Sequence, residues 1–303
     1  MPKNANLQAY VMLTFVTWGW GCNAILSKLA VNQISPMMLV SLRWIALLIL
    51  LLIFSHRQVV KDWSVIRQHL IYFALMGTIG FTFFNALYYI AAHTTSAINL
   101  GIIQGTTPIF VFIGSFLFLS KKITTLQILG VSTSLIGVTV VVIRGEFSQL
   151  QDLVFNRGDL FMLISCFFYA IYSIGLTRRP NIAPISLFTL LAGFAFLASL
   201  PLWVLEIQYQ GFQPPTPIGW IIVALITIIP SMMSQLLFIY AVELVGPGRS
   251  GMFLNLVPIF ASIMAVLYLG ENFERFHAIS LGLVLFGIFI AEFGKSEKVK
   301  ITA

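Results

Sequence analysis

The chain has 303 residues, of which 59% are hydrophobic and only 9% are charged. Soluble domains carry roughly 25% charged residues, so this composition excludes a water-soluble fold and indicates a polytopic membrane protein. The formal net charge of +7 is interpreted as a signal of membrane orientation and not as a nucleic-acid-binding surface.

Ten apolar segments follow one another along almost the whole chain. Each is close to the ~20 residues that a helix needs to cross a bilayer. The predicted spans are residues 8–31, 36–54, 69–92, 95–119, 124–143, 158–178, 184–206, 217–243, 247–269 and 276–294. The predicted fold class is therefore an all-α integral membrane protein with ten transmembrane helices.

Lysine and arginine gather at one set of span ends. With the N-terminus inside, twelve of the seventeen fall on the cytoplasmic side and three on the other, while Lys28 and Arg43 fall within spans or at their edges. Because cytoplasmic ends carry an excess of Lys and Arg, we expect both termini to be cytoplasmic.

The second half of the sequence repeats the first at an offset of 150 positions. Pro108-Ile109-Phe110 returns as Pro258-Ile259-Phe260, each inside a long apolar segment. A proline there removes a backbone donor and bends or breaks the helix. Further matches at this offset pair Gly101 with Gly251 and Asn85 with Gln235.

Each half holds five predicted spans, residues 1–145 and 146–303. Because five is odd, the second half enters the membrane upside down relative to the first. The sequence thus predicts an inverted-topology repeat, which is a recurring transporter design with the substrate near the midplane between the repeats.

The first two spans read Trp18-Gly19-Trp20-Gly21-Cys22-Asn23, then Lys28, Ser35-Pro36 and Arg43. This pattern resembles the opening of EamA-type carriers in the drug/metabolite transporter superfamily. The second half keeps the Leu-Gly-Glu ending typical of that family as Leu269-Gly270-Glu271, whereas the first half has Leu119-Ser120-Lys121 there. The resemblance implies ten helices in two inverted repeats, a bacterial inner membrane, and frequent export of amino acids or related metabolites.

Two cations within the predicted spans are candidate substrate anchors. Arg43 in the second span should face the protein interior, because a central arginine costs ~2.5–3.5 kcal/mol to insert. It either grips a substrate carboxylate or forms structural bonds to helix-end carbonyls. Lys28 either snorkels to the outer interface or points inward and makes the outer mouth positive.

Paired amides mark the third and eighth spans. Asn85 and its repeat partner Gln235 either bind a ligand or form interhelical hydrogen bonds. Phe81 and Tyr89 lie one turn before and after Asn85, on the same helix face. Together they predict a stripe of apolar and hydrogen-bonding contacts to one ligand.

The remaining candidates lie on the first, fourth, sixth and ninth spans. For ligand contact these are Asn23, Gln104, Tyr172 and Asn255. For the aromatic side chains, the alternative is a position in the aromatic belt at the membrane–water interface, or a role in helix packing. The candidates for a gate or hinge are Gly101, Pro108, Gly251 and Pro258. Close helix packing is the alternative for the glycines.

Catalytic and metal-binding signatures are missing from the sequence. His56, His69, His93 and His277 are scattered without metal-ligand spacing, so no metal, cofactor or enzymatic activity is expected. No acidic residue is predicted at the midplane, although Glu243 or His93 could bind a proton. The expected partners are a small molecule and the lipid bilayer, with no nucleic acid, and the chain is a monomer or weak homodimer.

Two functions are compatible with these sequence features. One is a carrier for small polar metabolites, foremost amino acids, or alternatively for amines and quaternary ammonium compounds held by aromatic side chains. The other is a membrane receptor or scaffold that transports nothing, which would not require matched prolines and amides in two inverted halves.

Overall fold

A computed structural model describes residues 3–119, 124–146, 156–246, 250–251 and 253–293, and all of its regular elements are helices. Those of the first half are α1 (Lys3–Leu29), α2 (Pro36–Ile66), α3 (Leu70–Gly77), η1 (Thr78–Phe83), α4 (Phe84–Ala92), α5 (Ala97–Gln104), α6 (Thr107–Leu119) and α7 (Thr125–Val142). Those of the second half are α9 (Arg157–Gly175), η2 (Leu176–Arg178), α10 (Pro184–Gln210), α11 (Pro217–Ile226), η3 (Thr227–Met233), α12 (Ser234–Val245), η4 (Leu254–Leu256), α14 (Val257–Leu269) and α15 (Arg275–Phe293).

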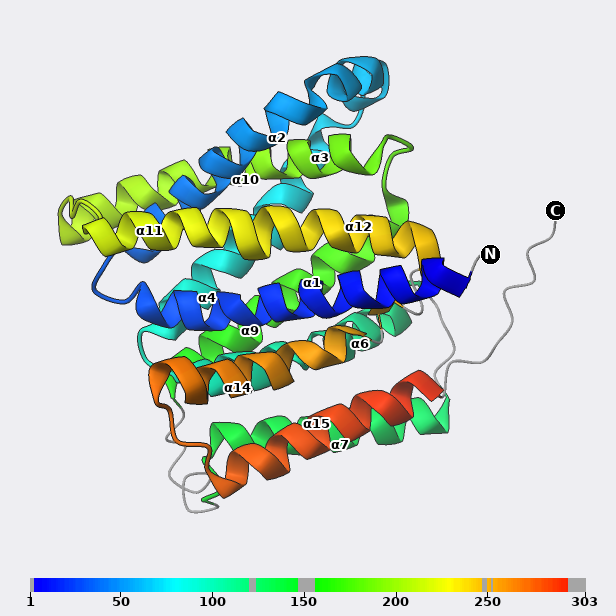
Figure 1. The fold of residues 1–303 in the computed structure, drawn as a ribbon, viewed down its shortest axis with the longest axis vertical. Coiled ribbons are helices and arrows are strands. Elements are labelled where there is room, and N and C mark those ends of the chain that lie inside the picture. Colours follow the sequence, from blue (N-terminus) through cyan, green and yellow to red (C-terminus); the bar gives the residue numbers. More distant parts are fainter. Residues whose placement is uncertain (1–2, 120–123, 147–155, 247–249, 252, 294–303) are drawn as a thin grey trace.

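Within the described residues, eight helical stretches are long and apolar enough to cross a membrane, and two shorter apolar helices cover 254–269 and 275–291. The long helices run side by side, and α1 begins on the same side of the bundle as α15 ends (Figure 1). The multi-pass helical architecture expected from hydropathy is therefore confirmed.

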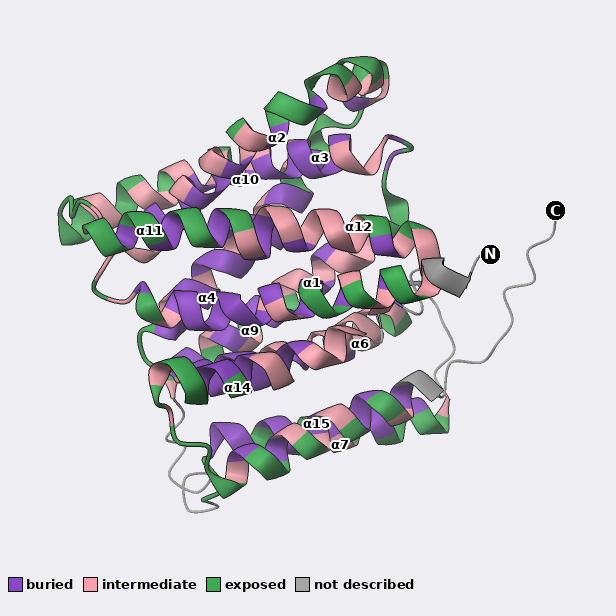
Figure 2. Ribbon diagram, viewed as in Figure 1, coloured by how far each residue is buried: buried purple, intermediate pink, exposed green. Residues whose placement is uncertain are grey.

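Apolar side chains cover the outside of this bundle as well as its core. The large apolar side chains of Phe54, Ile71 and Leu267 are 77%, 77% and 72% exposed. Leu117 is 64% exposed. Buried residues face the middle of the bundle while exposed ones lie on the outer helix faces (Figure 2). Such an outer surface suits contact with lipid tails, which are as apolar as these side chains.

The helices differ from the predicted spans at two notable places. The helix α2 continues to Ile66, twelve residues beyond the predicted end at 54, because hydropathy falls there while the chain stays helical. The fourth span is two helices, since α5 ends at Gln104 and α6 begins at Thr107. Pro108 thus lies in the first turn of α6, where a proline is tolerated, and Pro258 takes the same place in α14.

Both the third and the eighth spans contain a π-helical segment, η1 in the first half and η3 in the second. Shifted by the repeat offset, residues 78–83 fall on 228–233, within η3. Segments of this kind often mark functional sites. Pro230 explains the break in η3 because it lacks a backbone donor. Gly80 holds the corresponding place in η1.

The helices α7 and α15 pack directly against each other through glycines. A Cβ on Gly287 would lie 2.2 Å from Ser134 Oγ and 2.5 Å from the Gly130 carbonyl oxygen, so only glycine fits. Gly137, at the matching place of α7, would meet the Ser280 carbonyl oxygen at 2.9 Å. The contact is therefore nearly the same when the two helices are exchanged.

Carboxylates on one helix cap the beginning of another. Glu206 near the end of α10 accepts hydrogen bonds from the Met37 and Met38 backbone at the start of α2, at 3.1 and 3.3 Å. In return, Asp62 near the end of α2 accepts from the Ala183 backbone at the start of α10, at 3.1 Å. Each helix of this pair thus satisfies orphan donors of the other, which also suits the dipole of a helix N-terminus.

We expect Glu206→Ala to lower the stability of the folded protein by about 1–3 kcal/mol, because the first turn of α2 loses its acceptors. The measurement is the thermal unfolding midpoint of the purified protein in detergent micelles. The control is Glu243→Ala, since Glu243 is exposed on α12. Equal midpoints for the two variants would contradict the capping role of Glu206.

Candidate functional site

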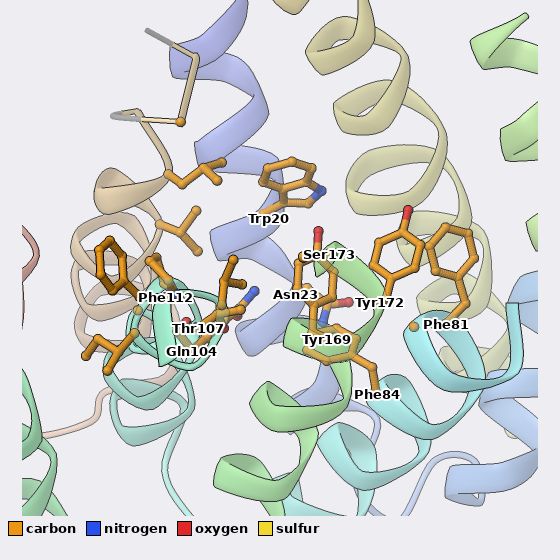
Figure 3. Close-up of a pocket in the computed structure, with 18 of the residues that line it drawn as sticks. Trp20, Asn23, Phe81, Phe84, Gln104, Thr107, Phe112, Tyr169, Tyr172 and Ser173 are labelled. Carbon is orange, nitrogen blue, oxygen red and sulfur yellow. Dashed lines mark hydrogen bonds between the residues drawn. The ribbon is translucent and has the colours of Figure 1, made fainter. Parts of the chain in front are cut away.

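A cavity of about 560 Å³ lies inside the bundle. Its wall is mostly apolar and aromatic, with a few polar side chains, which is the usual make-up of a small-molecule site. Gln104, Thr107 and Phe112 lie on one side, Phe81 and Tyr172 on the other, and Trp20 and Asn23 of α1 between them (Figure 3). The polar side chains of the wall are those of Asn23, Arg43, Asn85, Gln104, Thr107, Ser115, Gln127, Ser173, Ser231 and Gln235.

The cavity extends toward the side of the bundle on which α1 begins. Gln127 in the first turn of α7 and Ala291 near the end of α15 belong to its wall. The end of α15 lies on the same side as the start of α1 (Figure 1). The cavity therefore extends toward the face of the bundle on which α1 begins.

Polar contacts close the opposite end of the bundle. Lys28 Nζ donates to the carbonyl oxygens of Ala92 and Thr95, at 2.9 and 2.8 Å. Glu271 accepts from the backbone of Ala97 and Ile98 at 2.7 and 3.0 Å, and so caps α5. These bonds join α1, the turn after α4, α5 and the end of α14. We call this set of contacts the closed end.

Arg43 is the cation of the cavity, and neutral side chains hold it. Its side chain is buried, and Nε donates to Ser231 Oγ at 2.7 Å. Nη1 donates to Asn85 Oδ1 at 2.6 Å, to Asn23 Oδ1 at 3.4 Å and to the Tyr89 hydroxyl. The guanidinium thus bonds to side-chain oxygens, not to the helix-end carbonyls of the structural alternative.

One edge of the Arg43 guanidinium is left for a ligand. Within the part of the chain that the structure describes, Nη2 forms no hydrogen bond, and no carboxylate pairs with Arg43. The guanidinium carbon Cζ of Arg43 lies 4.9 Å from the centre of the Trp44 ring. The Trp44 ring stacks in turn on the Phe81 ring, with 4.7 Å between the ring centres. The charge is therefore fixed in position but not neutralised.

The two π-helical segments orient the partners of Arg43. Asn85 Nδ2 donates to the Phe81 carbonyl in η1 at 2.7 Å, which turns its oxygen toward Arg43. Ser231, within η3, donates to the Ile226 carbonyl at 2.7 Å and leaves its lone pairs for Arg43. Arg43 on α2 therefore links the π-helical regions of both halves.

Aromatic rings form the wall next to Arg43. A Cβ on Gly80 would lie 2.3 Å from the Tyr172 ring, so the glycine lets this ring pack against η1. Tyr172 also lies 5.4 Å from both Phe81 and Tyr169, measured between ring centres. In the described part of the molecule, the hydroxyl groups of Tyr169 and Tyr172 have no hydrogen-bond partner. They are available to a polar ligand group.

Nine of the residues predicted from sequence line this cavity. They are Asn23, Arg43, Phe81, Asn85, Gln104, Tyr172, Gln235 and, among the hinge candidates, Pro108; Gly251 lies there too. Gln104 Oε1 accepts from the Tyr88 hydroxyl at 3.3 Å, which leaves its amide nitrogen for the cavity. The side chain of Gln235 forms no hydrogen bond to any described residue. Their role in binding stays a prediction.

Five predicted residues lie outside the cavity wall. Tyr89 is behind the wall, where it holds Arg43. Lys28 is at the closed end, bonded to carbonyl oxygens and turned away from the cavity. Asn255 is in η4 and is not part of the wall. Gly101 and Pro258 pack α5 against α14, where a Cβ on Gly101 would lie 2.5 Å from Ala261 Cβ.

Sequence reasoning missed several residues of the site. Ser231 was overlooked as a partner of Arg43, and Trp44 as the ring beneath it. The usable signal was the pairing of two helix breakers, Gly80 and Pro230, at the repeat offset. It marks the π-helical segments, but the identity of the residue that bonds to Arg43 depends on tertiary packing.

If Arg43 holds a carboxylate, Asn85→Leu is expected to weaken that binding by about tenfold or more, because Arg43 loses a charge-assisted hydrogen bond that fixes its direction. The measurement is the ligand-induced shift of the thermal midpoint across a concentration series of leucine. The matched control is Asn255→Leu, which makes the same chemical change outside the cavity. A variant that fails to accumulate in the membrane would instead mark Asn85 as a helix-packing residue.

A multi-pass helical bundle around a central, mostly apolar cavity is an arrangement that membrane transporters use. The match to the EamA-like transporter family covers residues 7–143 and 156–293. The chain therefore belongs to the EamA-like transporter family, which confirms the resemblance seen in its first two spans. The family belongs to the drug/metabolite transporter superfamily.

Several relatives share the full length of the chain. The uncharacterized transporter YyaM of Bacillus subtilis (strain 168) is 26% identical over 293 residues, covering 94% of each protein. The uncharacterized transporter YetK of the same organism is 26% identical, covering 95% of this chain and 88% of that protein. One crystal structure of a protein superposes with a TM-score of 0.62 at 15% identity, covering 96% of this chain and 98% of that one, so it shares the fold.

Proposed function

We propose that this protein carries small polar metabolites with a carboxylate group, foremost amino acids and related compounds, out of the cell by alternating access. The observation that carries the proposal is Arg43, a buried cation in the cavity wall whose described partners are all neutral. A buried charge without a counter-ion is costly. A ligand carboxylate would supply the missing partner.

The geometry of Arg43 favours an oxygen anion over a neutral ligand. Nε and Nη1 are engaged, so Nη2 offers its donors to one oxygen of a carboxylate. Because two of its nitrogens are pinned, the guanidinium loses little freedom on binding. The nearby amides of Asn23, Gln104 and Gln235 could bond to an amino group or a polar side chain.

The remainder of the cavity suits an apolar or aromatic side chain. Phe81, Phe84, Tyr172 and Phe188 contribute aromatic rings to its wall. The volume of about 560 Å³ falls in the range of small-molecule sites, roughly 300–1,000 Å³, and accommodates any single amino acid.

Alternating access would arise from two inverted five-helix repeats, residues 1–145 and 146–303, that make ten spans. Three paired features support this proposal: the π-helical segments at one offset, the exchangeable glycine contacts of α7 and α15, and the mutual caps of α2 and α10. An approximate two-fold axis in the membrane plane would relate each pair. The cavity lies between the two halves, where inverted-repeat carriers bind substrate.

The proposed setting is a bacterial inner membrane with both termini in the cytoplasm. The excess of Lys and Arg at one set of helix ends supports this orientation. The cavity then approaches the cytoplasmic face, and the closed end faces the outside. This arrangement would load substrate from the cytoplasm, in keeping with export by a monomer or weak homodimer.

A second candidate function is the transport of amines or quaternary ammonium compounds. The aromatic rings of Trp44, Phe81, Tyr169 and Tyr172 could hold such a cation by cation–π contacts. The charge of Arg43 opposes it, because like charges repel strongly at low dielectric. The aromatic rings therefore favour a cationic ligand, whereas Arg43 favours an anionic one. A binding experiment distinguishes these two possibilities.

The test is a thermal-shift screen of the purified protein against matched pairs of compounds. Leucine and leucinamide have the same side chain and amino group, but only leucine has a carboxylate. We expect leucine and other amino acids to raise the unfolding midpoint and leucinamide and choline to leave it unchanged. A shift with amides and amines, and none with amino acids, would favour the second candidate.

A further inference from the structure

A carboxylate that the transport proposal does not use is buried where α9 begins. Asp159 has no solvent exposure, and it lies in the first turn of α9 beside the turn that joins α4 to α5. It is not among the residues predicted to form the site, because it stands at the edge of a predicted span. An acid at a helix N-terminus is ordinarily structural, so the position of Asp159 alone does not give it a role.

The partners of Asp159 are neutral and leave one of its oxygens poorly satisfied. Thr95 Oγ1 donates to Oδ1, and Asn99 Nδ2 donates to Oδ1 at 3.2 Å. Oδ2 receives only the longer contact from Asn99 Nδ2, at 3.4 Å. No lysine, arginine or histidine forms an ion pair with Asp159 among the described residues.

The side chain of Asn99 supplies the independent observation. It is 4% exposed, and its Oδ1 is a buried acceptor without any hydrogen-bond partner in the described part of the chain. Buried polar atoms are nearly always satisfied, so an orphan next to a carboxylate calls for a missing donor. A hydrogen on the Asp159 carboxyl group would be such a donor.

We propose that Asp159 and Asn99 form a proton-binding site. One proton from water adds to Oδ2 of the carboxylate and gives a neutral carboxylic acid. A modest rotation of the Asn99 amide then lets the acid donate to Asn99 Oδ1 while Asn99 Nδ2 still donates to Asp159 Oδ1. Acid and amide form a closed pair in which each donates once and accepts once, and no orphan remains.

The charged groups around this site come from several elements. Lys28 of α1 bonds to the Thr95 carbonyl, and Glu271 after α14 caps α5 one turn away. The positive charge of Arg144, which follows α7, interacts electrostatically with the carboxyl group of Asp159. His93 is exposed after α4, where partial desolvation and then the charge of Lys28 lower the pKa of its imidazole. Arg157 precedes Asp159 in its own helix, and the described parts of α5 and α6 carry no titratable side chain.

The site touches the closed end of the bundle directly. Thr95 bonds to Asp159 through its hydroxyl and to Lys28 through its carbonyl. His93 and Thr94 next to it are exposed, so water reaches this end of the chain. Opening of the closed end would separate these groups, so proton binding and opening are coupled. That coupling rests on the proposed function, whereas proton binding itself does not.

The test is infrared difference spectroscopy of the purified protein during a pH titration, which detects the C=O stretch of a protonated carboxyl group and needs no substrate. We expect the band of one carboxyl group to persist at a pH where exposed carboxyls, with ordinary pKa values near ~4, are already ionised. Asp159→Asn should remove this band, and the control Asp62→Asn should retain it.

Two results would overturn the proposal: no such band in the unmodified protein, or a band that persists in Asp159→Asn. If the asparagine variant does not fold, Asp159→Glu serves instead, because it keeps a carboxyl group and displaces it by one methylene. An unchanged band position and midpoint in that variant would equally overturn the assignment. Flux measurements then test the transport proposal separately.

Discussion

Arg43→Ala is expected to abolish the transport of carboxylate substrates while the protein still inserts and folds. Losing one partner of a buried, hydrogen-bonded charge pair costs about 2–5 kcal/mol, so binding should weaken by at least about 30-fold. Insertion should not suffer, because a central arginine is itself costly in a membrane helix. The measurement is the flux of labelled leucine into proteoliposomes, normalised to the amount of folded protein.

Arg67→Ala is the matched control for this experiment, since it removes the same charge from an exposed position just beyond α2. It should transport like the unmodified protein. Arg43→Lys is a second comparison, because lysine keeps the charge but cannot bond to Ser231, Asn85 and Tyr89 at once. Undiminished flux in Arg43→Ala would return Arg43 to a purely structural role.

The second large effect is expected from Gly287→Val, which should destabilise the folded protein by about 2–4 kcal/mol. The new Cβ would lie 2.2 Å from Ser134 Oγ and 2.5 Å from the Gly130 carbonyl oxygen, so α7 and α15 would have to separate. The measurement is the fraction of protein that stays monodisperse in size-exclusion chromatography after heating in detergent.

Gly282→Val is the matched control, because it introduces the same side chain on α15 where a Cβ meets nothing within 4 Å. The inverted-repeat proposal adds a further expectation, namely that Gly137→Val is as damaging as Gly287→Val. Gly137 has close contacts to Ser280 and Val284 from the other helix. A harmless Gly287→Val would show that the tight approach of the two helices is not needed for stability.

Much of the fold could be predicted from the sequence because a bilayer imposes a simple rule on length and hydropathy. Apolar segments of span length have to be helices, since every backbone group must be satisfied internally. The end of α2 escaped this reasoning. Residues 55–66 carry Arg57, Lys61 and Asp62, so hydropathy falls, yet nothing there breaks a helix.

The candidate site was predicted in part. Arg43 and Asn85 could be found because a charge and an amide inside apolar spans must face the protein interior. That they bond to each other, together with Ser231 from the other half, depends on how the helices pack. Lys28 exposes the limit most clearly, because sequence cannot distinguish a lysine that faces the cavity from one bonded to the carbonyl oxygens of Ala92 and Thr95.

Arg43 also suggests how ligand binding could be communicated to the rest of the protein. Its bonds to Ser231 and Asn85 connect the π-helical regions of the two halves. A carboxylate at Nη2 would compete for the same charge and so change the strength of these bonds. A ligand shifts a conformational equilibrium only by its differential affinity for the states, and this link offers one source of that difference.

Counterflow in proteoliposomes tests the central claim most directly. Vesicles loaded with an excess of an unlabelled amino acid are diluted into the same labelled compound, and accumulation of label requires a carrier that exchanges its two faces. Saturable accumulation for at least one amino acid, lost in Arg43→Ala and retained in Arg67→Ala, is the predicted result. Label uptake no greater than in protein-free vesicles, for every amino acid tested, would contradict it.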